Sequence, residues 1–209
     1  MRRSLLQQQG IALNTLERYD EALPLLTAAT DPSENGTAAS SIFKCVSRGW
    51  VDRALSAFHL KRHAEAVSAY TAATEIDPKY AVAYSMQGQL LMHVGRNVAA
   101  ARSFGMAVRL NETDVDSWQE LGKVQRRLQR WKDAAFSWSV VASLRPSASA
   151  LIERAMAVMI LGRHDEAREG FKQARRMNPS IGQRLDDVLA TTQVCPATGC
   201  ASVKALLGL

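Results

Sequence analysis

The sequence predicts an all-α protein built from about five similar pairs of helices. Residues of one kind return every 34 positions, as Ala66, Ala100 and Ala134 do. A large residue follows each of these alanines four positions later, which places both on one face of a helix. A period of this length is typical of arrays in which each repeat buries its apolar face against its neighbours. The predicted fold class is therefore an all-α solenoid.

The repeats follow one another with one interruption. We expect them at residues 3–36, 47–80, 81–114, 115–147 and 148–181. Ala22 lies 44 residues before Ala66, which is more than one period. A turn-rich string beginning at Asp31 predicts an insertion at about residues 31–41. Beyond it, helical spacing predicts a long first helix that reaches back towards Ser40.

The end of the array has its own pattern. Apolar residues at helical spacing predict a capping helix at about residues 181–192, which would close the array of residues 1–192. The remainder, 193–209, is a loop-like tail around Cys195 and Cys200. Whether this tail is disordered or docks on the array stays open.

The recurring large and small residues resemble the tetratricopeptide repeat (TPR) family. The fourth repeat shows this in Trp118-x-x-Leu121-Gly122, followed by Ala134 and Trp138. The resemblance implies a right-handed superhelix of helix-turn-helix repeats. Small residues are expected where the two helices of a repeat approach closely, at Gly10, Ala54, Gly88, Gly122 and Ala155 and at Ala22, Ala66, Ala100, Ala134 and Ala167. Large residues are expected to fill the space between successive repeats, at Leu26, Tyr70, Phe104, Trp138 and Phe171.

The family binds extended partners mainly in a concave groove that the first helix of each repeat lines. Carried over by register, this gives a predicted partner-binding groove of Leu55, Phe58, His59, Gln89, Met92, His93, Gln119, Lys123, Arg126, Arg127, Met156 and Met159. The places of a known chaperone-tail clamp hold Gln7, Ile11 and Asp52 instead, which argues against an adaptor of that type.

A basic cluster in the fourth repeat is the sharpest feature of this groove. Lys123, Arg126 and Arg127, with Arg130 beside them, lie on overlapping helix faces and repel one another unless an anion relieves them. We expect the cluster to hold a carboxylate or phosphate of the partner, with the flanking methionines taking its apolar side chains. The alternative is that Arg126 and Arg130 face solvent while the methionines pack beneath the capping helix.

Charge leaves a second class of partner open. The net charge is +6, and residues 115–181 carry 12 Lys and Arg against 7 Asp and Glu. A basic surface attracts acidic peptides or nucleic acid over long range. The leading prediction is a scaffold or adaptor that binds a protein or peptide with acidic and apolar residues, in a chaperone-like or complex-assembly role. Association with nucleic acid or a ribonucleoprotein is the alternative.

The sequence gives no catalytic motif. A turn between helices separates His59 from His63, so their spacing predicts no metal site, and there is no phosphate-binding glycine loop. We therefore expect no enzyme, no cofactor and no metal. Three cysteines form no disulfide framework, and no apolar segment follows Arg2 and Arg3, so we expect a cytoplasmic protein without signal peptide or membrane insertion.

Overall fold

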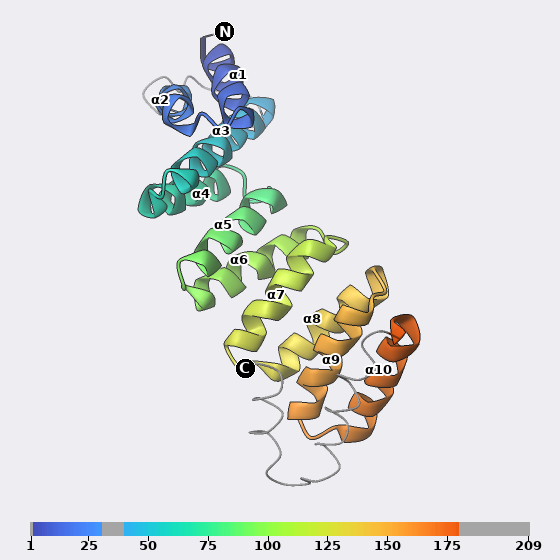
Figure 1. Cartoon of the computed structure of the whole chain (residues 1–209). Coiled ribbons are helices and arrows are strands. Elements are labelled where there is room, and N and C mark those ends of the chain that lie inside the picture. Colours follow the sequence, from blue (N-terminus) through green and yellow to red (C-terminus); the bar gives the residue numbers. More distant parts are fainter. Residues whose placement is uncertain (1, 31–39, 180–209) are drawn as a thin grey trace. The chain divides into compact units, whose positions relative to one another are not determined.

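The computed structural model describes residues 2–30 and 40–179, and this part of the chain contains ten α-helices (Figure 1). They are α1 (Arg2–Thr15), α2 (Tyr19–Ala29), α3 (Ser40–His59), α4 (His63–Ile76), α5 (Ala81–His93), α6 (Asn97–Leu110), α7 (Val115–Arg127), α8 (Trp131–Leu144), α9 (Ala148–Ile160) and α10 (His164–Met177). The all-α prediction is confirmed, and α3 begins at Ser40 as predicted. The predicted capping helix, the tail and residues 31–39 of the predicted insertion lie outside the described residues.

The chain forms two compact units, and the division between them falls within the sequence of α7. Unit 1 comprises residues 1–117, and unit 2 begins at Trp118. In unit 1, α1 packs on α2, α3 on α4 and α5 on α6, and each pair also contacts the next through α2 with α3 and α4 with α5 (Figure 1). In unit 2, α9 packs on both α8 and α10. Helix pairs stacked in chain order are the arrangement of an α-solenoid.

The turn between the two helices of a pair has the same geometry five times. One residue in each turn has a positive φ: Glu17, Lys61, Gly95, Gln129 and Gly162, with φ of 58°, 61°, 79°, 58° and 79°. The next N–H bonds back to the first helix, as in Arg96 N–H to Leu91 O at 2.8 Å and Arg130 N–H to Gln125 O at 2.8 Å. This is the Schellman motif, which ends a helix sharply and satisfies its last carbonyls.

An arginine begins the second helix of each pair, as the N-cap residue. Four of these arginines form an ion pair with the acidic residue three positions later: Arg18 with Glu21, Arg62 with Glu65, Arg130 with Asp133, and Arg163 with Glu166. The acidic residue lies in the first turn, where the helix dipole favours negative charge. The sequence analysis did not predict this recurring ion pair.

Glycines in the first helices allow the large residues to pack within a repeat. A Cβ added at Gly122 would lie 2.8 Å from Nε1 of Trp138, and one at Gly88 would lie 2.9 Å from the ring of Phe104. At Gly10 the nearest atom of Leu26 would be 2.5 Å away. We expected these large residues between successive repeats, but each of the three contacts the glycine of its own repeat. A bulky side chain needs a facing position without a side chain when helices pack closely.

Candidate functional site

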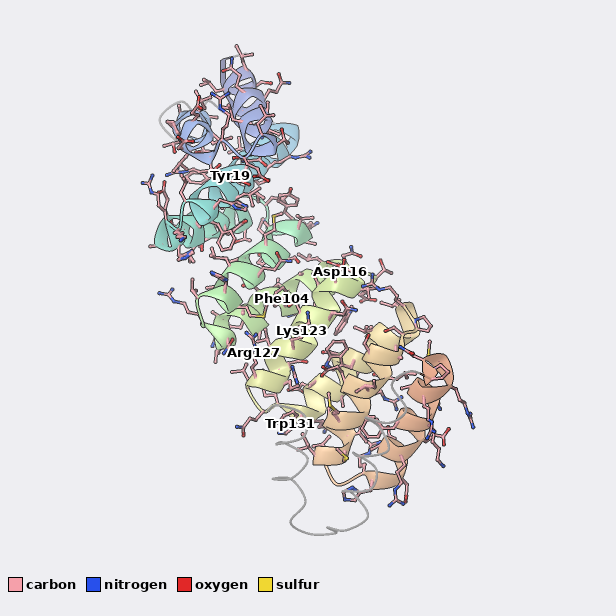
Figure 2. All side chains as sticks on the ribbon, in the orientation of Figure 1. Tyr19, Phe104, Asp116, Lys123, Arg127 and Trp131 are labelled. Carbon is pink, nitrogen blue, oxygen red and sulfur yellow. The ribbon has the colours of Figure 1, made fainter. Side chains whose placement is uncertain are left out.

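The predicted groove residues divide between the two units. Those in unit 1 are the half-buried Leu55, Phe58 and Met92 and the exposed His59, Gln89 and His93. Those in unit 2 are the half-buried Gln119, Lys123 and Arg126, the exposed Arg127, and the buried Met156 and Met159. Figure 2 shows Lys123 and Arg127 on α7.

In unit 1 the structure brings two predicted histidines, His59 and His93, against the ring of a third predicted residue, Phe58. The centroid of the Phe58 ring lies 5.5 Å from that of His59 and 5.3 Å from that of His93, both edge to face. Two of these residues end α3, and His93 ends α5. Edge-to-face rings at this separation attract one another, so the three side chains hold each other in place.

Two further rings extend this aromatic cluster. His63, the first residue of α4, lies 5.8 Å from Phe58 and 5.5 Å from His93 by ring centroid. Tyr19, the first residue of α2, stacks on His59 at 4.1 Å with the ring planes 3° apart, and it lies beside α3 in Figure 2. The sequence reading treated both residues as structural. Their shared register at the start of a second helix was the signal that could have placed them here.

The aromatic cluster therefore consists of Tyr19, Phe58, His59, His63 and His93. It gathers at the turns of the three helix pairs of unit 1. Among the described residues, no group of three or more His, Cys, Asp or Glu side chains is placed to hold a metal ion. The cluster offers flat apolar faces and imidazole nitrogens, which suit a peptide side chain and its neighbouring polar groups.

A half-buried carboxylate lies on the same helix as Phe58. Oδ2 of Asp52 is buried and has no hydrogen-bond partner among the described residues. Burial raises the pKa of Asp52 to about 6, against the opposing effects of a hydrogen bond with Gln7 and the charge of Arg48. Nearby, Asn14 Nδ2 donates to the backbone carbonyl of Asp52 at 3.1 Å, and Ser56 Oγ donates to Asn14 Oδ1 at 2.7 Å. These polar contacts tie α1 to α3.

In unit 2, the cations of the basic cluster are paired by carboxylates of the chain itself. Lys123 Nζ lies 2.5 Å from Glu120 Oε1, and Arg126 Nε lies 3.6 Å from Glu153 Oε2 of α9. Burial raises the pKa of Glu153, which the charges of Arg126 and Lys123 partly oppose. The repulsion expected between like charges is thus relieved internally, without a partner anion.

Arg127 differs from its neighbours in this basic cluster. It is exposed and forms no ion pair with the residues that the structure describes, whereas Arg130 lies 2.7 Å from Asp133. Met156 and Met159 are both 5% exposed, so in this structure their side chains belong to the core of unit 2. Of the predicted groove in unit 2, Arg127 is therefore the residue most open to a partner.

Comparison with known proteins identifies the repeat. The sequence model of the tetratricopeptide repeat family matches residues 47–80. Residues 47–80 therefore form a tetratricopeptide repeat. TPR proteins are generally non-enzymatic scaffolds, and the helix pairs of this chain have the architecture of a protein-interaction scaffold.

Two human relatives are longer than this chain. Superkiller complex protein 3 is 27% identical over 60% of this chain, and the chain spans 8% of that protein. Tetratricopeptide repeat protein 33 is 32% identical over 46% of this chain, which covers 36% of it. The chain thus matches a minor part of each relative.

Solved structures share the fold at low sequence identity. The crystal structure of MamA protein has a TM-score of 0.71 at 17% identity, covering 87% of this chain and 94% of that one. YrrB, described as a TPR protein with an unusual peptide-binding site, has a TM-score of 0.67 at 15% identity, covering 83% and 85%. In the described part of this chain, no helix has the length and apolarity needed to cross a membrane.

Proposed function

We propose that this TPR protein is a scaffold that binds an extended segment of a partner protein, with the aromatic cluster of unit 1 as its anchor. The observation that carries this proposal is the contact of Phe58 with both His59 and His93, at 5.5 and 5.3 Å. Both imidazoles are exposed, while the phenyl ring is half-buried. Open rings fixed by their neighbours favour binding, because little rotamer freedom remains to be lost.

The surroundings of the cluster suit a segment with apolar and polar side chains. Half-buried Leu55 and Met92 come from the same two helices as Phe58 and His93, and exposed Gln89 can donate to and accept from a peptide backbone. Flexible thioethers adapt to varied side-chain shapes. Two supports come from other proteins: superkiller complex protein 3 is named as a member of a complex, and YrrB is described as peptide-binding.

The test uses the whole wild-type chain as bait to select binding peptides from a displayed random library. The affinities of the selected peptides are then measured for wild type and for the double variant His59→Ala with His93→Ala. Both side chains are exposed, so their removal leaves the fold intact. We expect affinity to fall by about tenfold or more, since aromatic residues dominate binding hot spots. The matched control removes two exposed side chains of α6, Arg102→Ala with Arg109→Ala, and should leave affinity within about twofold.

If the selected peptides bind wild type and the histidine variant with equal affinity, the aromatic cluster is not their binding site. The variant Arg127→Ala then tests whether the peptides bind the basic cluster of unit 2 instead, because Arg127 is the exposed cation of that cluster. Thermal melts of all three variants confirm that each is folded. Loss of binding in the Arg127 variant alone would show that the partner is anchored by this charged residue and not by the aromatic cluster.

A further inference from the structure

A shallow cleft in unit 2 lies apart from the predicted groove. Its volume is about 270 Å³, and its walls come from α8, α9 and the start of α10. The residues that matter for its chemistry are Lys132 and Phe136 of α8, Arg154 of α9, Leu161 of the turn, and Arg163 at the N-cap of α10.

The cleft uses a different face of α9 from the predicted groove. Its α9 residues, Arg154 and Val158, lie two positions before and two positions after Met156, a residue of the predicted groove. Two positions correspond to about 200° around an α-helix of 3.6 residues per turn. A ligand in this cleft and a segment on the groove face would therefore contact opposite sides of the helix.

Exposed apolar side chains stand at the rim of the cleft. Phe136 is 62% exposed and Leu161 is 41% exposed, above a floor that includes the buried Val158. The Phe136 ring packs edge to face against Trp118 with centroids 5.9 Å apart, so it is held in one orientation. A large aromatic ring fixed by its neighbour and left open to solvent is a favourable contact for an apolar side chain.

The charges around the cleft are predominantly positive. Lys132, Arg154 and Arg163 line it together with a single carboxylate, Glu166. Arg154 lies 2.7 Å from Glu166, and Arg163 also pairs with it. Lys132 forms no ion pair with the described residues. One carboxylate shared by two arginines leaves the cleft with an excess of positive charge.

An equivalent cleft in unit 1 has the opposite character. It is lined by α2 and the start of α4 and has a volume of about 540 Å³. The arginine–glutamate arrangement is the same, because Arg53 and Arg62 pair with Glu65 at 3.2 and 2.8 Å. However, Asp20 occupies the register of Lys132, and Pro24 that of Phe136. The framework therefore belongs to the fold, while the cation and the exposed ring are specific to unit 2.

We propose that the cleft of unit 2 is a second docking site, for an acidic protein segment that carries an apolar side chain. The apolar side chain packs on Phe136 and Leu161, and flanking carboxylates pair with Lys132 and Arg163. Charge complementarity selects this occupant, since three cations face one carboxylate. The site goes beyond the proposed function, because it lies in the other unit and engages a segment of different chemistry.

The test uses a fluorescein-labelled peptide, Glu-Glu-Leu-Phe-Glu-Glu, and measures its anisotropy with the whole chain. The double variant Lys132→Asp with Phe136→Ala should weaken binding by about tenfold or more, because one charge is reversed and the ring is removed. The matched control changes an exposed cation and an exposed apolar residue of unit 1, Lys79→Asp with Val82→Ala. It should change affinity by less than about twofold. Lys132→Gln alone leaves Phe136 in place and should weaken binding by about threefold.

Four results would overturn the proposal. The first is equal binding of the acidic peptide by wild type and the double variant, and the second is equal affinity of the wild type for the uncharged peptide Gln-Gln-Leu-Phe-Gln-Gln. The third is displacement of the acidic peptide by an oligouridylate. The fourth is a wild-type dimer in sedimentation that the double variant abolishes. The third would identify a nucleic-acid surface, and the fourth would identify a second copy of the chain as the occupant. The histidine variant of unit 1 should bind the acidic peptide normally, so this test and that of the proposed function fail independently.

Discussion

At the scale of single residues, Asp52 is the clearest case of a side chain set by its surroundings. Its carboxyl group is half-buried, Oδ2 has no hydrogen-bond partner among the described residues, and the pKa is raised to about 6. Its register in the repeat matches that of Glu153, whose pKa is also raised by burial. Since burial disfavours the ionised form, each carboxylate costs stability at neutral pH.

Asp52→Asn should therefore stabilise the protein above pH 6. In the folded protein the pKa of Asp52 is about 6, whereas the ordinary pKa of an aspartate is 3.8. Between these two pH values the folded state therefore binds more protons than the unfolded state. Wild-type stability falls as pH rises through that window. The variant should gain about 1 kcal/mol at pH 7.5, a figure discounted for solvent screening, and the gain should vanish near pH 4.

Urea unfolding of both proteins between pH 4 and pH 8 measures this difference. Glu75→Gln, at an exposed position of α4, removes a carboxylate charge without removing a buried one. A stability gain for Asp52→Asn that does not depend on pH would show that burial of the charge is not its source.

At the scale of the helices, the fit of a glycine against a large ring determines how closely two helices of a pair approach. A Cβ at Gly122 would meet the indole of Trp138 at 2.8 Å, whereas a Cβ at Gly105 of α6 would meet no atom within 4 Å. Both glycines lie inside helices. The same substitution therefore has opposite consequences at the two positions.

Gly122→Ala should destabilise the protein by about 1 to 3 kcal/mol, because Trp138, only 4% exposed, has little room to move. Gly105→Ala should stabilise it by about 0.5 to 1 kcal/mol, since alanine loses less backbone entropy in a helix. Thermal and urea unfolding of both variants measure the two signs. Destabilisation by both variants would contradict the conclusion that contact with Trp138 decides the sign of the effect at Gly122.

At the scale of the whole molecule, the cations of the basic cluster are less available to a partner than their number suggests. Of the cations in and around the basic cluster, Lys123, Arg126 and Arg130 each have a carboxylate partner. Nucleic-acid binding depends on cations that can neutralise phosphates and release counterions. Paired cations contribute less, so the basic cluster is a weaker site for a phosphate backbone than its composition suggests.

A labelled oligouridylate should accordingly show no saturable binding to the wild-type chain near physiological salt. Freeing two cations through Glu120→Gln with Asp133→Asn should raise its affinity severalfold at low salt, because Lys123 and Arg130 then lose their partners. Anisotropy at about 50 and 200 mM salt measures both. Tight wild-type binding that falls by about a thousandfold across this range would instead favour the nucleic-acid alternative.

The sequence by itself determined the all-α repeat architecture and the close approach at Gly88 and Gly122. Both depend on a short-range rule: a small residue must face a large one at a fixed spacing, and the period repeats that rule. The start of α3 at Ser40 followed from the same helical spacing.

Only the tertiary structure decided how the candidate site is composed. Phe58 meets His93 because two helix pairs stack, and Arg126 is paired because Glu153 comes from another helix. Burial of Met156 likewise depends on what surrounds α9. Long side chains reach partners that register does not specify, so a periodic pattern predicts the backbone that carries a site but not the charges and rings that remain open on it.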